Sequence, residues 1–159
     1  MEDKLSKYPV VVIASPNELK LVQEHIGFEI SAIIITGIGY GNVFSVLNAV
    51  PRDTKIINIG YAGSNCLEIG SVYDISRVEN YHPNVTYKES SYNLVTSGTA
   101  ISVPCYTSSD FVLKTDIKTP CVFDMELYAI MSMGFKNVRS IKVVSDNLNY
   151  KEYEDNSKD

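Results

Sequence analysis

A chain of 159 residues, 45% of them hydrophobic, is long enough for one compact domain with a substantial core, and we predict a single domain over residues 1–159. The formal net charge of −5, with arginines only at positions 52, 77 and 139, argues against nucleic acid as a partner. No apolar run reaches the roughly 20 residues of a membrane span, and the charged start lacks the apolar stretch of a signal peptide. We therefore predict a cytoplasmic protein without membrane contact.

The first half of the chain alternates apolar strands with helices. Residues 8–14, YPVVVIA, are typical of a strand buried on both faces of a parallel sheet. Ser15, Pro16 and Glu18 then supply an N-cap, a first-turn proline and a capping-box glutamate, which predict a helix to about Gly27. The same rhythm continues with a second buried strand within residues 29–42, a helix over 43–50 and a third strand over 55–63. This order predicts an α/β fold with a mostly parallel central sheet and flanking helices.

The second half begins with more polar, alternating segments, residues 71–81 and 92–104, which predict antiparallel or mixed strands. The pattern then returns to a short apolar strand, a helix from about 124 to 134 and a last apolar strand over 137–146. Asp146 stands at the carboxyl end of this strand, the edge where α/β sheets bind ligands. Residues 148–159 are polar and predict a frayed helix or disorder.

The three cysteines, Cys66, Cys105 and Cys121, are odd in number and lack the spacing of a metal site. In a cytoplasmic protein we expect reduced thiols in or near the core. The sequence therefore predicts neither a disulfide framework nor a bound metal.

Two carboxylates, Asp124 and Glu126, open the segment VFDMELYAIM. Asp124 fits a helix N-cap, and Glu126 is a favoured residue of a first helical turn. The helix that follows is apolar on nearly every face, so a buried Glu126 needs a partner such as the hydroxyl groups of a ligand. Helix capping and ligand contact both remain open for this pair.

Three glycine-rich strand ends, residues 36–42, 58–65 and 143–147, would meet if their strands are neighbours, and would form a pocket with the start of the helix at Met125. The segment GIGYGN is a poor dinucleotide-binding fingerprint, because Asn42 replaces the third glycine. No Gly-Lys-Ser/Thr occurs either, which excludes a P-loop.

The segments IIITGIGYGNV, KIINIGYAGSNCLEIGSVYDIS, VFDMELYAI and IKVVSDN resemble, in this order, the signature segments of the purine nucleoside phosphorylase and uridine phosphorylase superfamily. They are most similar to its methylthioadenosine/S-adenosylhomocysteine nucleosidase branch, and the similarity spans most of residues 10–147. The resemblance implies a nucleoside phosphorylase-like fold and hydrolysis of a purine nucleoside, without metal or organic cofactor. It also implies a homodimer, because this chain is shorter than typical members and lacks their final helix after VVSDN.

The resemblance further implies roles for individual residues. Met125 would pack beneath the ribose, Glu126 would bind the ribose hydroxyls, and Asp146 would give a proton to N7 of the purine. These roles suit the chemistry, since cleavage of an N-glycosidic bond builds positive charge on the ribose and negative charge on the departing base. The other implied substrate contacts are Ser145 beside the acid, the base-stacking Phe111, the backbone of Val112, and the strand end with Tyr61, Ala62 and Gly63.

Several positions depart from the family pattern. In the hydrolytic branch a Glu just after the first strand activates water, and the aligned position here is Pro16. Glu18 either takes over this catalytic role or serves only the capping box. Tyr61 stands where relatives usually carry a small residue, and would narrow the pocket. His82 either contacts the sugar or belongs to a turn before Pro83.

Three functions therefore remain open. The first is a purine nucleoside hydrolase. The second is a nucleoside-binding protein of the same fold that has lost water activation. The third, a nucleoside phosphorylase, is disfavoured because the glycine-rich loops carry no arginine for phosphate.

Overall fold

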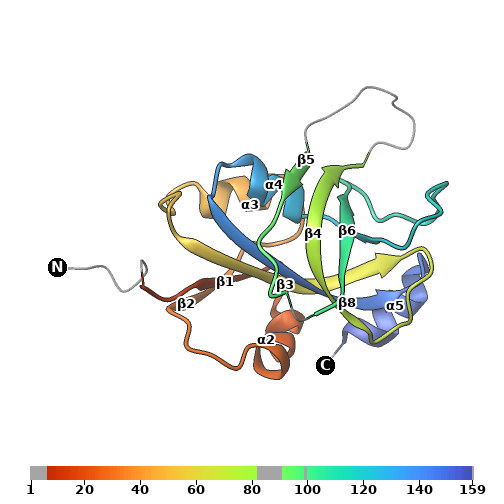
Figure 1. Cartoon of the computed structure of the whole chain (residues 1–159). Helices are drawn as coiled ribbons and strands as arrows, with labels where there is room; N and C mark the ends of the chain where they lie inside the picture. Colours follow the sequence, from red (N-terminus) through yellow and green to blue (C-terminus); the bar gives the residue numbers. More distant parts are fainter. Residues whose placement is uncertain (1–6, 82–90, 99, 159) are drawn as a thin grey trace.

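The structure is a computed structural model that describes residues 7–81, 91–98 and 100–158. The elements up to the third strand are β1 (Val10–Ile13), the 3-10 helix η1 (Pro16–Glu18), α2 (Leu19–His25), β2 (Ala32–Ile35), α3 (Tyr40–Leu47) and β3 (Lys55–Ser64). The remaining elements are β4 (Val72–Asn80), β5 (Ser91–Asn93), β6 (Ser102–Thr107), β7 (Val122–Asp124), α4 (Leu127–Ser132), β8 (Asn137–Asp146) and α5 (Tyr150–Ser157). Figure 1 shows them along the chain.

The strands of the described residues form one eight-stranded sheet in the order β2-β1-β3-β7-β6-β4-β5, with β8 paired to both β3 and β4. The pairs β1 with β2, β1 with β3, β3 with β8, β4 with β6 and β6 with β7 are parallel. The pairs β3 with β7, β4 with β5 and β4 with β8 are antiparallel. Strands β3, β7, β6, β4 and β8 therefore form a closed ring.

The predicted α/β class is confirmed, but the sheet is mixed and partly closed where the sequence predicted a mostly parallel one. The reason lies in the connection after β3. Parallel neighbours need a long crossover, usually a helix, whereas the residues between β3 and β4 contain no helix. The chain turns back after β3, and β4 runs antiparallel to β8, the parallel neighbour of β3.

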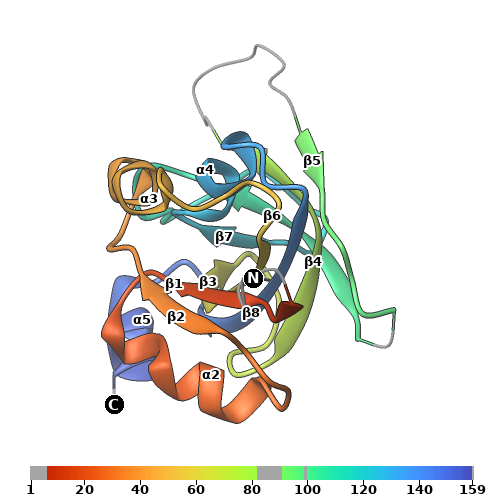
Figure 2. The ribbon, with the colours of Figure 1, turned by 90° about the vertical axis from the view of Figure 1, so that its left-hand side faces the viewer.

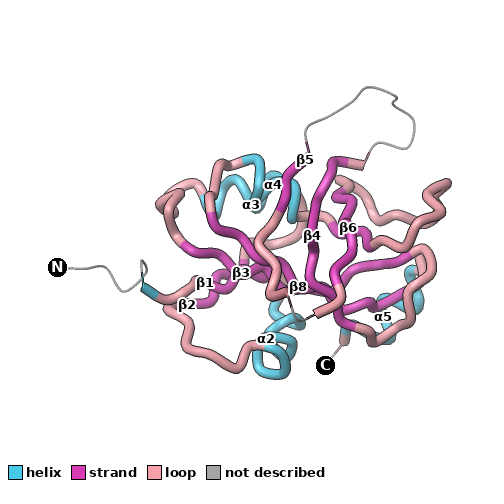
Figure 3. Tube along the Cα trace, viewed as in Figure 1, coloured by secondary structure: helices cyan, strands magenta, loops and turns pink. Residues whose placement is uncertain are grey.

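Helices cover both faces of the sheet around β1, β3 and β8. Figures 1 and 2 show α3 and α4 on one face and α2 and α5 on the other, and Figure 3 shows the strands between the helices. Along β1, Val10 and Val12 join the core beneath α3 and α4, while Val11 and Ile13 join the core beneath α2. This two-sided burial explains the unbroken apolar run of β1.

Several predicted elements differ from the structure. In place of the predicted strand over 92–104, β5 ends at Asn93 and β6 begins at Ser102, and the helix predicted over 43–50 is α3, Tyr40–Leu47. β2 is an edge strand, and its Ile33 and Ile35 are each 41% exposed, so the prediction of a strand buried on both faces is wrong here. The predicted helix over 124–134 is shorter, because residues 122–124 pair as β7 with β3 and β6. The predicted last strand, residues 137–146, coincides with β8.

For residues 148–159 the sequence predicted a frayed helix or disorder, and the structure has helix α5 there. Asn149 caps it, since its Oδ1 accepts a hydrogen bond from the backbone N–H of Glu152 at 3.0 Å. Asn156 Nδ2 donates to the carbonyl of Ser145 at 3.1 Å, and Asn17 Nδ2 donates to the carbonyl of Ser157 at 2.7 Å. A short helix thus follows β8 and is fastened to η1 and to the end of β8.

Across the described residues, no helix combines the length and the apolar character needed to cross a membrane.

Candidate active site

A cavity of about 350 Å³ lies at the carboxyl edge of the parallel strands β1, β3 and β8. This is the edge at which α/β sheets bind ligands, and the volume falls in the lower part of the usual range for small-molecule sites. The cavity brings together most of the predicted site residues, namely Glu18, Tyr61, Ala62, Gly63, Phe111, Met125, Glu126, Ser145 and Asp146.

Two predicted residues lie elsewhere. Val112 lines a small neighbouring cavity that shares Gly63, Phe111 and Asp146 with the main one. His82 lies outside the described residues. The roles assigned to all of these residues remain predictions.

Glu18 reaches the cavity from η1 although its side chain is only 6% exposed. Its Oε1 accepts hydrogen bonds from the backbone N–H groups of Ala14 at 2.9 Å and Ser15 at 3.3 Å, and its Oε2 accepts one from Tyr61 at 2.8 Å. Burial raises the pKa of Glu18, and the nearby Lys142 and these N–H groups oppose the rise. The side chain of Glu18 therefore makes the capping contact to Ser15 and also lines the cavity.

Pro16, which the family comparison aligned with the water-activating Glu, is not among the described residues that line the cavity. Glu18 is, so the carboxylate that could activate water stands two residues further along the chain.

Gly60 on β3 lies directly against Glu18. A Cβ atom at this position would stand 2.5 Å from Glu18 Oε2. We expect Gly60→Ala to push the carboxylate off its backbone donors and to lower the free energy of unfolding by about 1–3 kcal/mol, the cost of leaving buried polar groups unpaired. Urea unfolding measures this loss. Gly27→Ala is the matched control, because a Cβ there meets no atom within 4 Å; equal stability of the two variants would contradict the placement of Glu18.

Glu126 precedes α4 and reaches across to the start of α3. Its Oε2 accepts a hydrogen bond from the backbone N–H of Gly39 at 2.9 Å. Burial and the neighbouring charge of Asp124 raise the pKa of Glu126 from 4.5 to about 7, while Lys142 and the Gly39 N–H oppose the rise. The side chain faces the cavity and not its own helix, so it is free to bind the hydroxyl groups of a ligand.

The raised pKa of Glu126 predicts that Glu126→Gln stabilises the folded protein, and that this stabilisation depends on pH. Between pH 4.5 and about 7 the folded protein holds a proton on Glu126 that the unfolded chain has released, so this group destabilises the fold as pH rises. Glutamine keeps an acceptor for Gly39 and does not ionise. We expect it to raise the midpoint of thermal unfolding at pH 8 and leave it nearly unchanged at pH 4.5. The exposed Glu24→Gln is the control; an equal effect of Glu126→Gln at both pH values would refute the shift.

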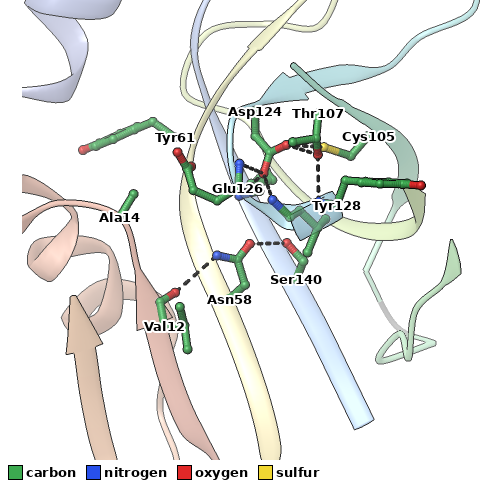
Figure 4. A network of polar contacts seen from close by, with 12 residues as sticks. Val12, Ala14, Asn58, Tyr61, Cys105, Thr107, Asp124, Glu126, Tyr128 and Ser140 are labelled. Carbon is green, nitrogen blue, oxygen red and sulfur yellow. Dashed lines mark hydrogen bonds and ion pairs between the residues drawn. The ribbon is translucent and has the colours of Figure 1, made fainter. Parts of the chain in front are cut away.

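Asp124 also lines the cavity, and its contacts hold the surrounding elements together. Its Oδ2 accepts from the backbone N–H of Leu127 at 2.8 Å. The N-cap of α4 is nevertheless Glu126, and Asp124 ends β7, so the predicted N-cap lies two residues too early. Asp124 Oδ1 accepts from Thr107 Oγ1 at 2.5 Å and Cys105 Sγ at 3.3 Å, as Figure 4 shows. Lys142 Nζ lies 3.1 Å from Asp124 Oδ2. Asp124 thereby links β6, β7, β8 and the first turn of α4.

Sequence reasoning missed Lys142. The signal was present, because this lysine is the only charged residue in the apolar run IKVV of the last strand. Its neighbours Ile141 and Val143 belong to the core beneath α2. A lysine carried into such a strand must pair with a buried carboxylate.

Asp146 ends β8 and lines the cavity, with its side chain buried. Its Oδ1 accepts from Ser145 Oγ at 2.7 Å, and its Oδ2 accepts from the backbone N–H groups of Leu148 at 3.0 Å and Asn149 at 3.3 Å. Burial raises the pKa of Asp146, against the effect of these donors. The carboxyl group therefore holds a proton more readily than an exposed aspartate. Gly63 leaves room for it, since a Cβ there would stand 2.8 Å from Oδ2.

An aromatic wall closes the cavity beside Asp146. The ring centroid of Phe111 lies 5.4 Å from that of Tyr150 and 5.5 Å from that of Tyr153, and the two tyrosine rings are 5.9 Å apart. Both tyrosines belong to α5 and line the cavity. Sequence reasoning predicted the Phe111 contact and missed the tyrosines, because the polar tail gave no sign that it folds over the site.

The described residues include no group of three or more His, Cys, Asp or Glu side chains arranged to hold a metal ion. Three carboxyl groups, Glu18, Glu126 and Asp146, line a largely apolar cavity with an aromatic wall. Such a cavity suits a flat, polar molecule that carries hydroxyl groups, and its buried carboxyls suit proton transfer.

No protein-family model matches the chain, and no curated protein sequence matches it. Solved structures do. An MTAN from Chlamydia trachomatis bound to adenine superposes with a TM-score of 0.74 at 16% identity, covering 93% of this chain and 88% of that one. The 5'-methylthioadenosine/S-adenosyl homocysteine nucleosidase of Helicobacter pylori gives 0.69 at 16% identity, covering 92% and 89%. Futalosine hydrolase of H. pylori gives 0.69 at 14% identity, also covering 92% and 89%. The chain therefore has the fold of these nucleosidases, as the sequence resemblance implied.

Proposed function

We propose that this protein is a purine nucleoside N-ribosyl hydrolase that resembles the methylthioadenosine/S-adenosylhomocysteine nucleosidases. The proposal rests on the observation that Glu18, Glu126 and Asp146 line one cavity. In the sequence, Glu18 and Asp146 lie more than a hundred residues apart. Each of the three supplies a group that hydrolysis of an N-glycosidic bond requires.

In the proposed reaction the bond between C1' of the ribose and N9 of the purine breaks, and its electron pair goes to the base. Asp146 gives a proton to N7, so the base leaves in neutral form. Glu18 takes a proton from a water molecule, whose oxygen forms the new bond to C1'. Glu126 accepts hydrogen bonds from the ribose hydroxyls while positive charge builds on the sugar. Phe111 gives the flat base an aromatic surface, and Met125 contacts the sugar.

The structural neighbours support a small purine compound as the partner. The C. trachomatis protein was crystallised with adenine, and an Asp-to-Asn mutant of the H. pylori nucleosidase holds 5'-methylthioadenosine in its active site. Futalosine hydrolase, by its name, acts on another compound. We propose methylthioadenosine as the first substrate to test.

A nucleoside-binding protein without turnover is the second candidate. One observation favours it, because the Glu18 carboxylate already accepts three backbone hydrogen bonds, from Ala14, Ser15 and Tyr61. These contacts oppose the rise that burial gives to the pKa of this carboxyl group. A nucleoside phosphorylase is a third and weaker candidate, since Arg52, Arg77 and Arg139 are not among the described residues that line the cavity.

We also propose a homodimer in the cytoplasm. Apolar side chains on and near β2 and α3, including Ile33, Ile35, Ile38 and Phe44, are each 41–50% exposed and would suit contact with a second copy. Light scattering after size-exclusion chromatography measures the mass; a monomer at micromolar concentration would contradict this part of the proposal.

The function is tested by incubating the purified protein with methylthioadenosine, S-adenosylhomocysteine, adenosine and inosine, with and without phosphate, and detecting free base by chromatography. Release of base without phosphate supports the hydrolase. Release that depends on phosphate indicates the phosphorylase, and thermal stabilisation by a nucleoside without release indicates the binding protein.

A further inference from the structure

The first turn of α4 is capped by side chains from the sheet and not by its own N-cap residue. Glu126 occupies the N-cap position, but its side chain makes no capping hydrogen bond. Its Oε2 instead accepts from the backbone N–H of Gly39, the N-cap of α3, at 2.9 Å. An N-cap side chain normally accepts from the N–H of the second or third helical residue. That donor needs another acceptor here, because a buried N–H group without one is costly.

Thr107 supplies this acceptor. It ends β6 directly opposite Asp124, the last residue of β7. Its Oγ1 accepts from the backbone N–H of Tyr128, the second residue of α4, at 3.0 Å, and donates to Asp124 Oδ1 at 2.5 Å (Figure 4). Thr107 is fully buried and is not among the described residues that line the cavity. One buried hydroxyl group therefore makes the contact that the side chain of Glu126 would otherwise make.

Asp124 completes the cap. Its Oδ2 accepts from the backbone N–H groups of Leu127 at 2.8 Å and Glu126 at 3.4 Å. Its own carbonyl accepts from the N–H of Ser108 at 3.0 Å, and Lys142 Nζ lies 3.1 Å from its Oδ2. Contacts from β8, from the end of β6 and from α4 therefore fix Asp124, and through it the backbone of Glu126.

We propose that Thr107 is a positioning residue that caps α4 in place of Glu126 and so leaves the Glu126 carboxyl group facing the cavity, on Gly39. The catalytic consequence rests on the proposed function, in which Glu126 binds the ribose hydroxyls. Without Oγ1 of Thr107, the N–H of Tyr128 would lose its acceptor. The Glu126 carboxyl group would then turn back toward this N–H, as an N-cap side chain normally does, and would leave Gly39.

Three variants at Thr107 separate the hydroxyl group from the shape of the side chain. Thr107→Val keeps the shape and removes the hydroxyl group, and Thr107→Ser keeps the hydroxyl group. Thr107→Cys offers only a weak acceptor and serves where the valine variant does not fold. Thr54→Val is the matched control. Thr54 is also buried, but it lies just before the amino end of β3, whereas the cavity lies at the carboxyl end of that strand.

The deciding measurement is the position of the Gly39 amide proton signal in the NMR spectrum of the ligand-free protein. Glu126→Ala removes the acceptor and marks where this signal lies when the contact is lost. We expect the signal to move toward that position in Thr107→Val, and part of the way in Thr107→Cys. It should stay in place in Thr107→Ser and Thr54→Val.

Two results would overturn the inference. One is an unchanged Gly39 signal in Thr107→Val, or in Thr107→Cys if only that variant folds. The other is a movement in Thr107→Ser as large as in Thr107→Val, because the hydroxyl group would then not be what holds Glu126 in place.

Catalysis gives a second readout, with adenosine and with 2',3'-dideoxyadenosine, which lacks the ribose hydroxyls. At pH 8, above the pKa of about 7 of Glu126, Thr107→Val should lower kcat/KM for adenosine by about 10- to 100-fold, the usual effect of losing a hydrogen bond to a charged group. The value for the dideoxy compound should change little, and Thr107→Ser should restore the value for adenosine. A variant that only weakened the fold would lower both values alike, which would contradict a positioning role.

The NMR measurement needs no turnover. Failure of the proposed function, seen as no release of base from any nucleoside, is therefore distinguishable from failure of this inference, seen in the Gly39 signal.

Discussion

Replacement of Asp146 with asparagine is expected to slow release of the purine base by about 10²- to 10⁴-fold, the usual contribution of a general acid. The fold should tolerate the change. The asparagine carbonyl can accept from the N–H groups of Leu148 and Asn149, and its NH₂ group can donate to Ser145 Oγ, so each of the present contacts keeps a partner. What is lost is the proton that burial helps the carboxyl group to hold.

The measurement is kcat and KM for methylthioadenosine, with the midpoint of thermal unfolding as a check on folding. We expect kcat to fall and nucleoside binding to persist. The exposed Asp53→Asn is the matched control and should behave as the unmodified protein. Full activity in Asp146→Asn would remove this residue from the reaction and leave its burial as a structural feature of the strand end.

Glu18→Gln is the second change with a large expected effect. Glutamine can still accept hydrogen bonds through one oxygen, but its NH₂ group cannot take a proton from water, so we expect release of the base to fall by about 10²- to 10⁴-fold. Because the NH₂ group would face an N–H donor, either at Tyr61 or at Ala14 and Ser15, some loss of stability is also expected.

Single-turnover assays measure the loss of chemistry, and ligand-induced thermal stabilisation shows whether the variant is folded. A folded but inactive variant still binds nucleoside and is stabilised by it. Glu24→Gln, on the exposed side of α2, is the control. Retained turnover in a folded Glu18→Gln variant would show that Glu18 is only a structural group, and the departure from the family pattern at Pro16 would then need another explanation.

Local patterns predicted much of the fold. The last strand coincides with β8 because its largely apolar run is buried from Ser140 to Asp146, and η1 begins where the Ser15-Pro16 signal placed a helix start. The closed ring of strands could not be predicted from the sequence. The pairing of β7 with β3 and β6 depends on contacts between distant segments, which no local pattern encodes.

The site was predicted through resemblance, and its omissions have physical causes. Tyr150 and Tyr153 lie in a helix of mostly polar composition that is held by contacts to Asn17 and Ser145, so nothing within the tail itself signals a cavity wall. Glu18 was predicted either to cap the helix or to activate water, and its carboxyl group accepts from Tyr61 of β3 as well as from Ala14 and Ser15.

The closed ring of strands implies that some parts of the site are more rigid than others. β8 has a partner on each side, β3 and β4, so its amide hydrogens should exchange with solvent among the slowest in the protein. Asp146 and Lys142 stand on this strand of the closed ring, while Tyr150 and Tyr153 of the aromatic wall belong to a short helix fastened by a few side-chain hydrogen bonds. Amides of α5 should exchange faster, and a ligand should enter and leave past this helix, without disturbing the charges at the base of the cavity.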